Sequence, residues 1–500
     1  MKKSITLLTV FFLLSTGLLN ASDHNILDFG AVPGQLSTVS VQKAVDACTA
    51  SGGGRVIVPA GRFITGTVIL KSNVNLYLEA GAELYGSDNL ADYKTSDQTK
   101  GMIFCEDAFN VSISGVGTIN AGGIRFYETD QNHVYEEFNK SKTRQKENYM
   151  PDGVFFTDGP LKRKPKPGMT IVFFHCTKVS ITGITILDTP SWATRFGYCE
   201  DVHIDGITIL NNILIPNSDG IHLTASRNIR ISDCNIFAGD DCIVMTGFPK
   251  DEENPEINSL EQDSHTFGNK SIFAENLTVT NCILKSSSSG IRVGYGQHPI
   301  RRCVFSNIII YDSHRGIGIF AHDASDITDI IFSDIIIETK LLNGQWWGHG
   351  EPIHLSSVSR FEGRKTGQIK NVQFNNINAT GEQGILMYAQ KESPMENIRF
   401  NNVQLRMRKG KETMNYGGNF DLRPATPIDL QIFEHDIPGL YAQYINGLEV
   451  RNFTLKWDSD LPDFFTHGIE CLHVNGLILE SFNGTGNPNS PGAKPKMLVN

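Results

Sequence analysis

The most regular feature of the chain is a short run of alternating apolar and polar residues, interrupted near its middle by Gly, Asn or Asp. The run appears at least ten times, and the copies that begin at Val179, Val202 and Ile229 lie 23 and 27 residues apart. Alternation with a period of two is typical of β-strands, and a regular spacing above twenty residues indicates stacked repeats. The pattern predicts an all-β solenoid, because a propeller blade needs about 40 to 45 residues.

The Gly, Asn and Asp residues between the two halves of each run fit a sharp corner. Such a corner needs left-handed backbone angles or local side-chain hydrogen bonds. Asp205, Asp233 and Asp334 occupy this position. We therefore predict that these three carboxylates are structural rather than catalytic.

Three segments depart from the repeat. Apolar residues recur at helical spacing before the first coils, at Val41, Ala44, Val45 and Cys48, which predicts a helix that caps the open end of the solenoid. Two long polar interruptions, about 122–168 and 246–270, break the repeat, and we expect them to form walls of a cleft. The part from about Met414 onward is predicted to carry further coils.

The amino terminus has the features of a secretory signal peptide. Lys2 and Lys3 precede an apolar run, and a cleavage point follows Ala21. The apolar run is shorter than the roughly 20 residues of a membrane-spanning helix, which argues against an N-terminal anchor. We predict a signal peptide at 1–21 and a single domain at 22–500, exported to the periplasm or the exterior as a monomer without membrane attachment.

Charge and cysteine usage narrow the functional classes. The formal net charge of -10 at pH 7 argues against a nucleic-acid partner, because binding to phosphates depends on clustered Lys and Arg. The nine cysteines show no CxxC spacing, so neither a zinc cluster nor a thiol redox motif is indicated. Several lie in apolar runs and are predicted to be buried thiols, although pairing of some in an oxidising compartment remains open.

Two short segments concentrate carboxylates. Asp219 lies in NSDGIHL, whereas Asp240 and Asp241 lie in AGDDCI, 21 residues after Asp219. This interval is close to one coil, and stacked coils are about 4.8 Å apart, so we expect the carboxylates to meet on one face. Their mutual repulsion raises at least one pKa, which suits the acid and base of glycoside hydrolysis. A calcium site is the alternative, since clustered carboxylates also bind hard cations.

These motifs resemble those of the polygalacturonase-like glycoside hydrolases of family 28. NSDGIHL is similar to the family's Asn-Thr-Asp-Gly motif and GDDC matches its paired-aspartate motif, and the resemblance extends from NILDFGAVPG at 25–34 to about residue 340. The resemblance implies a right-handed parallel β-helix that needs no metal or cofactor. It also implies that Asp240 is the general acid, and that Asp219 and Asp241 activate water for inversion. The distance between two catalytic carboxyl groups is shorter in retaining than in inverting glycosidases. Closely spaced aspartates would therefore indicate retention of configuration, so the expectation of inversion rests on the resemblance.

Two motifs depart from the family pattern. Ser288, Ser289 and Gly290 stand where the family has Gly-His-Gly, and Gly318, Ile319 and Phe320 stand where it has Arg-Ile-Lys. In typical members, that Arg and Lys hold the galacturonate carboxylate. Their loss makes plain polygalacturonan a doubtful substrate.

Other residues are candidates for substrate binding. Arg292 and Arg315 follow the altered motifs and could grip a carboxylate as a fork. Trp346 and Trp347 could stack on a sugar ring or anchor a loop. The remaining candidates are Asn217, His222, His314, His322 and His349.

The sequence thus predicts an exported hydrolase of α-linked, galacturonate-containing polysaccharide or oligosaccharide. Rhamnogalacturonan-type or exo-galacturonidase specificity fits the two altered motifs better than plain endo-polygalacturonase activity. Two alternatives stay open. One is a β-helix polysaccharide lyase that uses calcium and an Arg or Lys base, and the other is a β-helix that binds glycans without catalysis.

Overall fold

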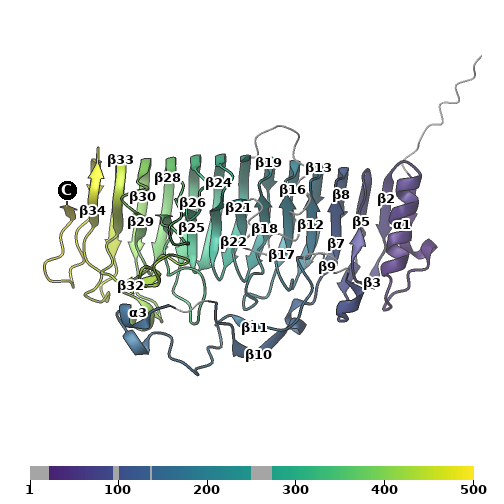
Figure 1. Ribbon diagram of the computed structural model, residues 1–500, viewed down its shortest axis with the longest axis horizontal. Coiled ribbons are helices and arrows are strands. Elements are labelled where there is room, and N and C mark those ends of the chain that lie inside the picture. Colours follow the sequence, from purple (N-terminus) through teal and green to yellow (C-terminus); the bar gives the residue numbers. More distant parts are fainter. Residues whose placement is uncertain (1–21, 94–100, 136–137, 249–272, 500) are drawn as a thin grey trace, which may run out of the picture.

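The computed structural model describes residues 22–93, 101–135, 138–248 and 273–499. In these ranges, 32 strands form one continuous sheet that winds into an elongated solenoid (Figure 1). Strands of successive coils pair in parallel and in register, as β13 (Thr177–Thr182) does with β16 (Glu200–Asp205). The winding is right-handed, the usual hand of parallel crossovers. The predicted right-handed parallel β-helix is confirmed, whereas the predicted signal peptide lies outside the described residues.

The strands stack in three rows. The first row contains β4 (Val68–Ile69), β7 (Ile103–Glu106), β12 (Ile171–Phe174), β15 (Thr194–Gly197), β18 (Ile221–Thr224), β21 (Ile243–Gly247), β23 (Ser289–Gly296), β25 (Arg315–Phe320), β27 (Ile353–Ser357) and β29 (Ile385–Ala389). The second contains β2 (Gly54–Val58), β5 (Val74–Leu78), β8 (Phe109–Gly115), β13, β16 and β19 (Arg227–Ser232), and the third contains β3 (Gly61–Thr65), β6 (Ala82–Gly86), β9 (Thr118–Asn120), β14 (Thr185–Leu187), β17 (Thr208–Leu210) and β20 (Asn235–Ala238). Farther along, one long strand per coil serves the last two rows, namely β22 (Ala274–Ser286), β24 (Ile300–Ser313), β26 (Ile327–Thr339), β28 (Ile369–Gly381) and β30 (Met395–Met407). The still longer β33 (Leu440–Trp457) serves all three rows. The solenoid ends with β34 (Ile469–Asn475), β35 (Ile478–Asn483) and β36 (Lys496–Val499).

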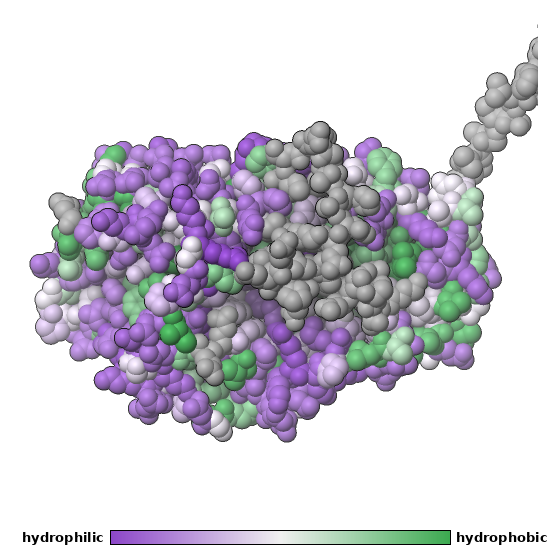
Figure 2. Space-filling view, viewed as in Figure 1, coloured by the Kyte–Doolittle hydropathy of each residue, from purple (hydrophilic) through white to green (hydrophobic). Residues whose placement is uncertain are grey.

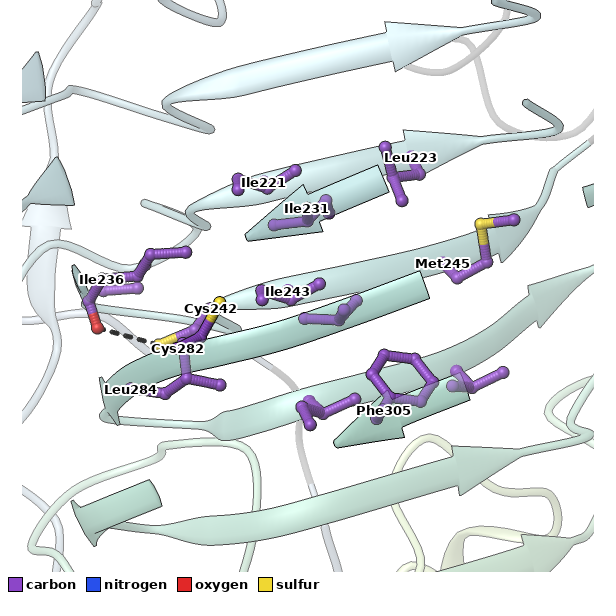
Figure 3. Close-up of a cluster of buried hydrophobic side chains, with 14 of the residues drawn as sticks. Ile221, Leu223, Ile231, Ile236, Cys242, Ile243, Met245, Cys282, Leu284 and Phe305 are labelled. Atoms are coloured by element: carbon purple, nitrogen blue, oxygen red, sulfur yellow. Dashed lines mark hydrogen bonds between the residues drawn. The ribbon is translucent and has the colours of Figure 1, made fainter. Parts of the chain in front are cut away.

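The core consists of inward-facing side chains stacked in columns along the solenoid. Phenylalanine rings stack with centroids 4.8 to 5.1 Å apart and planes within 9° of parallel, from Phe305 through Phe332 and Phe374 to Phe400. Figure 3 shows another part of the core, where Ile221 and Leu223 of β18 lie beside Ile243 and Met245 of β21. A slip of one residue in the pairing would turn these columns toward solvent, so the alternating pattern fixes the register.

The predicted corners have the expected geometry at two of three positions. Asp233 and Asp334 have left-handed φ angles of 57° and 58°. The Asp334 carboxylate accepts a hydrogen bond of 2.9 Å from the Asn376 amide on the next coil. At the third corner Gly206 takes the left-handed angle, with φ of 61°, and Asp205 instead accepts a hydrogen bond of 2.6 Å from Ser232 Oγ.

The N-terminal end of the solenoid is closed by a helix, as predicted. Helix α1 (Thr38–Ala50) covers this end (Figure 1) and buries one stripe of side chains, Val41, Ala44, Val45 and Cys48. It follows β1 (Ser22–Asn25) and the 3-10 helix η1 (Ile26–Phe29). The cap keeps the first coil from presenting an open edge to other strands.

A long excursion between β9 and β12 lies along one side of the solenoid (Figure 1). It contains the 3-10 helices η3 (Gly123–Phe126), η4 (Lys140–Lys142) and η5 (Lys146–Asn148) and the antiparallel pair β10 (Tyr127–Asn132) and β11 (Leu161–Arg163). We call residues 122–168 the strap. Its middle contacts a second excursion, 408–439, which contains α3 (Thr413–Tyr416), β31 (Asn419–Asp421) and β32 (Ile432–Glu434). The further coils predicted after about Met414 are present, and they begin at β33, after this excursion.

All nine cysteines are buried and free, as expected for thiols that pack as small hydrophobes. The molecular face in Figure 2 is largely hydrophilic, with scattered hydrophobic residues. Among the described helices, none is long and apolar enough to cross a membrane.

Candidate active site

The in-register pairing of β18, β21, β23 and β25 aligns the turns that precede these strands. Ile221 pairs with Ile243, Ile243 with Ile291, and Ile291 with Ile317. The residues two positions earlier therefore stack on successive coils, in the order Asp219, Asp241, Ser289 and Arg315. Asp240 lies one position before Asp241. The structure thus brings the three predicted aspartates together, with Asp241 rather than Asp240 in register with Asp219.

Asp241 is the most completely hydrogen-bonded of the three. One carboxylate oxygen, Oδ1, accepts hydrogen bonds from Ser288 Oγ at 2.9 Å and from the Ser289 backbone N–H at 3.0 Å. The other, Oδ2, accepts from Nε of Arg292, whose side chain is itself buried. A buried carboxylate with a cation and two further donors is well compensated for the loss of water.

Asp240 has weaker compensation. Among the residues that the structure describes, its carboxylate accepts hydrogen bonds from backbone donors alone, from Asn217 at 3.1 Å and from Asp241 at 3.0 Å. Burial and the nearby charge of Asp241 raise the pKa of Asp240 to about 7, although Arg292 opposes the shift. Asp240 can therefore carry a proton near neutral pH, as a general acid must.

Asp219 is held by a buried histidine. His222 Nδ1 lies 3.2 Å from Asp219 Oδ2, and the imidazole stacks on Trp192 with centroids 3.5 Å apart. Asp219 Oδ1 is buried and has no hydrogen-bond partner among the described residues. Burial and the charges of Asp240 and Asp241 raise the pKa of Asp219 well above its usual value. Burial lowers the pKa of His222, so the ring is neutral and positions Asp219 by hydrogen bonding.

The three carboxylates line a pocket of about 390 Å³ together with four arginines, Arg292, Arg315, Arg360 and Arg423. Arg315 Nε lies 3.4 Å from Glu351, and Arg360 Nε donates to Asp323 at 2.6 Å. Arg423 is paired with Asp421 at 2.6 Å. A guanidinium carries five N–H donors, so pairing with one carboxylate leaves donors on Arg315 and Arg360 for a second anion. The pocket thus combines acidic groups with cations that suit an acidic ligand.

Most of the chain matches a known protein family. A model of the family described as glycosyl hydrolases family 28 matches residues 48–338, which is more than half of the 500-residue chain. The chain belongs to this family. As a member, the protein is a glycoside hydrolase, and the predicted resemblance is confirmed.

Individual relatives are distant. A probable polygalacturonase from Vitis vinifera is 29% identical over 245 residues, which cover 45% of this chain and 44% of that protein. An endo-polygalacturonase from Pectobacterium carotovorum subsp. carotovorum is 23% identical over 372 residues, or 67% of this chain and 87% of that protein. Among solved structures, the family 28 exopolygalacturonase of Yersinia enterocolitica superposes with a TM-score of 0.62 at 17% identity, covering 92% of this chain and 79% of that chain. At this identity, the superposition supports the shared fold.

The two adjacent tryptophans of this family 28 protein have different environments. Trp346 is fully buried, and its indole N–H donates to the Asp158 carbonyl in the strap at 2.9 Å. Trp347 lines the pocket and packs against Tyr135, with centroids 5.1 Å apart. Of the two hypotheses for this pair, loop anchoring therefore fits Trp346 and sugar stacking fits Trp347.

We expect substitution of Trp346 to affect mainly stability and substitution of Trp347 to affect mainly substrate binding. Trp346→Ala should lower the free energy of unfolding by about 3 to 5 kcal/mol, because it empties a fully buried site. Trp347→Ala should change that free energy by less than about 1 kcal/mol and raise KM several-fold through lost ring stacking. Denaturant unfolding and initial-rate kinetics measure the two effects. Equal destabilisation by both substitutions would contradict this division.

Several predicted binding residues do not reach the pocket. His222 lies beneath Trp192, and His314, His322 and His349 are buried outside the pocket lining. His322 bonds to Ser356 Oγ at 2.7 Å, and His349 bonds to the Tyr416 carbonyl at 2.8 Å. Burial lowers the pKa of each of these histidines. They are neutral and support the walls of the pocket.

The residues that stand in place of the two family motifs have defined contacts in the structure. Ser289 stands at the histidine position and donates its backbone N–H to Asp241, and the preceding Ser288 donates its hydroxyl to the same carboxylate oxygen. Gly318 has no room for a side chain, since a Cβ there would lie 2.6 Å from the Phe320 ring. Arg315 Cζ lies 4.9 Å from the centroid of that ring, so Phe320 supports the cation that stands nearby.

Sequence reasoning missed Arg360 and Arg423. Both lie outside the repeating coils, where periodicity gives no register. A usable signal was present in DLRP, because an acidic residue two positions before an arginine can hold it, and Asp421 does so here. For the calcium alternative, no group of three or more His, Cys, Asp or Glu side chains in the described ranges is arranged to hold a metal ion.

Proposed function

We propose that this family 28 enzyme hydrolyses α-glycosidic bonds in galacturonate-containing pectic chains, with inversion at the anomeric carbon. The observation that carries the proposal is the pairing of Asp240, whose pKa is about 7, with Asp241, whose charge Arg292 balances. One carboxyl can thus be protonated while its neighbour is ionised, as acid and base catalysis of glycoside hydrolysis requires.

In the proposed mechanism, Asp240 donates its proton to the glycosidic oxygen as the bond to the leaving sugar breaks. Asp219 and Asp241 bind a water molecule, and Asp241, whose charge is balanced by Arg292, accepts its proton as the water attacks the anomeric carbon. His222 positions Asp219 through the hydrogen bond at Nδ1. Asn217, whose backbone N–H holds Asp240, also lines the pocket and is assigned to substrate binding.

The arginines support an acidic sugar as the substrate. Arg315, Arg360 and Arg423 line the same pocket as the aspartates, and a guanidinium binds a carboxylate through two parallel hydrogen bonds. They supply the positive charge that the missing Arg-Ile-Lys motif would otherwise provide. Arg292 is assigned a different role from the one predicted, because its Nε is bonded to Asp241 and its Nη1 to the Gly294 carbonyl.

The pH dependence of the rate should report the protonation of Asp240. Because its pKa is raised to about 7, the acid form prevails below that pH and is lost above it. We expect kcat/KM to fall about tenfold per unit above roughly pH 7, with an apparent pKa that belongs to the coupled aspartates. A flat profile between about pH 6 and about pH 9 would contradict Asp240 as the acid.

Defined pectic oligosaccharides test the reaction itself. Oligogalacturonates and rhamnogalacturonan fragments are incubated with the enzyme, and products are followed by mass and by anomeric NMR. Release of the β-anomer first supports inversion, whereas first appearance of the α-anomer would overturn it. An unsaturated, ultraviolet-absorbing product would indicate the lyase alternative. The fragment cleaved fastest, and the end from which monomers appear, distinguish rhamnogalacturonan-type, exo and endo specificity.

We also propose export of the protein. The support is the arrangement of Lys2, Lys3, the apolar run and Ala21 in the sequence. N-terminal sequencing of protein recovered from the periplasm or medium should begin at Ser22.

A further inference from the structure

The column of stacked turns that holds the catalytic aspartates continues one coil beyond Arg315. Ile317 of β25 pairs with Ile353 of β27. The residues two positions earlier, Arg315 and Glu351, therefore lie on neighbouring coils in the same register. The Gly316 N–H also donates to the Glu351 carbonyl at 3.0 Å. Glu351 is thus the next member of this column, on the side of Arg315 that lies away from the aspartates.

The Glu351 carboxylate faces Arg315 from within the protein. The Glu351 side chain is fully buried, and its Oε2 lies 3.4 Å from Arg315 Nε. The same oxygen accepts a hydrogen bond of 2.7 Å from the His349 backbone N–H. Burial opposes the charge of Glu351, but Arg315 and His354 together hold its pKa below the usual range. An ionised and fixed carboxylate therefore lies directly behind the guanidinium.

The remaining contacts of Arg315 leave the outer end of its side chain available. Its Cζ lies 4.9 Å from the centroid of the Phe320 ring, and its backbone N–H donates to the Ser288 carbonyl at 2.7 Å. Its Nε has no hydrogen-bond partner among the described residues, so the attraction to Glu351 is one of charge. Arg315 also lines the pocket, where its terminal nitrogens are the donors that remain for a ligand.

Two other cations of the pocket are held through the same atom. Arg292 Nε donates to Asp241, and Arg360 Nε donates to Asp323 at 2.6 Å. A carboxylate bound at Nε contacts the guanidinium beside its aliphatic stem and leaves the two terminal nitrogens free for other partners. The recurrence of this arrangement indicates that the direction of each of these arginines is fixed by a carboxylate behind it.

We propose that Glu351 is a positioning residue, which directs the Arg315 guanidinium toward the carboxylate of the substrate. The inference rests on the proposed function, because it requires a uronate that Arg315 binds. Glu351 is buried beneath Arg315 and acts through it. A guanidinium binds a carboxylate through two parallel hydrogen bonds, which depend on its orientation. Loss of the Glu351 charge should therefore reduce discrimination between acidic and neutral sugars.

Glu351→Gln tests this role, because the amide has almost the same shape and can still accept the His349 N–H, but it lacks the charge that holds Arg315. The probes are digalacturonate and its dimethyl ester, which has no free carboxylate. Calorimetry on the Asp240→Asn protein measures their binding without turnover. We expect Glu351→Gln to weaken binding of the diacid about tenfold and to leave binding of the diester unchanged. In the active enzyme, KM for the diacid should rise while kcat changes little.

Three results would overturn the assignment. Unchanged binding of the diacid would mean that Arg315 keeps its position without Glu351. Tighter binding of the diacid would mean that Glu351 competes with the substrate for Arg315. An equal loss with the diacid and the diester would indicate a general effect on structure.

A double-mutant cycle determines whether Glu351 acts through Arg315. Arg315→Gln alone should weaken binding of the diacid, and addition of Glu351→Gln should cause no further loss. Additive losses would give Glu351 a separate role and contradict the proposal. If Glu351→Gln fails to fold because it leaves Arg315 buried without a counterion, Glu351→Asp replaces it. This variant keeps the charge but withdraws it by one methylene group, and an unchanged ratio of diacid to diester affinity would then count against the proposal.

Glu382→Gln is the matched control. Glu382 is also buried, accepts a hydrogen bond of 3.0 Å from the Leu341 N–H and lies 3.8 Å from Arg408 Nε, but it is outside the pocket lining. The substitution should leave the ratio of diacid to diester affinity unchanged. Failure of the proposed function is distinguishable, since the wild-type enzyme would then cleave no oligogalacturonate. Failure of the positioning role alone would leave wild-type cleavage intact.

Discussion

Asp240→Asn is expected to lower kcat roughly a thousandfold, within the range attributed to general acid catalysis, while KM changes little. The amide has nearly the same shape as the carboxyl but cannot deliver a proton to the leaving oxygen. The backbone N–H of Asn217 bonds to one oxygen of this side chain and that of Asp241 to the other, so the amide oxygen can keep one of the two bonds. Reducing-sugar release from oligogalacturonates measures the loss, and thermal unfolding verifies that the variant is folded.

Asp334→Asn is the matched control for this substitution. Asp334 lies at an exposed corner and accepts a hydrogen bond from Asn376, whose own amide oxygen accepts one from Asn402 on the next coil. Asparagine tolerates the same left-handed angle, so this variant should keep full activity. A folded Asp240→Asn enzyme with activity near wild type would remove Asp240 from the mechanism. If the inactive Asp240→Asn variant still binds oligogalacturonates as tightly as the wild type, the wild-type protein is an enzyme and not merely a glycan-binding β-helix.

Arg292→Gln is expected to lower the free energy of unfolding by about 3 kcal/mol or more, because it leaves Asp241 buried without its counterion. Arg292 and Asp241 are both buried. Activity should fall as well, since the same ion pair sets the charge balance around Asp240. Chemical denaturation and initial rates measure the two effects.

Arg227→Gln provides the comparison on the outside of the solenoid. Arg227 and Glu200 form an ion pair at 2.7 Å with both side chains partly exposed, and such pairs contribute about 1 kcal/mol or less. Adding Asp241→Asn to Arg292→Gln should recover part of the lost stability, because both charges are then absent. Equal destabilisation by Arg292→Gln and Arg227→Gln would mean that burial does not strengthen the first pair.

The sequence was most informative where structure repeats. Alternation in the strands and the spacing of coils are local properties, and together they predict the solenoid, the corners at Asp233 and Asp334 and the stacking of the aspartate turns. The helix cap could also be predicted, because the buried stripe of α1 lies in one short segment. Each of these features depends on residues that are neighbours in the chain or one coil apart.

The parts that could not be predicted depend on contacts between distant segments. Arg360 and Arg423 reach the pocket through irregular loops, and nothing in their local sequence fixes the direction of those loops. The same applies to Trp346 and Trp347, which are adjacent in the chain but differ because the strap covers only Trp346 completely. For His222, the motif indicated the right neighbourhood, yet its burial follows from the stacking of Trp192 on the ring.

The contacts of the strap also determine when during synthesis the protein can become active, because the strap bonds to residues that are made much later. Asn139 bonds to Asp429 and Arg144 to Asp436, residues that lie 290 and 292 positions later. Coils of a solenoid can pair with their predecessors as they emerge during synthesis, so the three aspartates can assemble early. The wall that carries Tyr135 and covers Trp346 acquires these anchors only after the segment around α3 and β32 exists. The complete pocket therefore forms only late in the synthesis of the chain. A chain that ends before this segment would contain the three aspartates but would lack the anchored wall of the pocket.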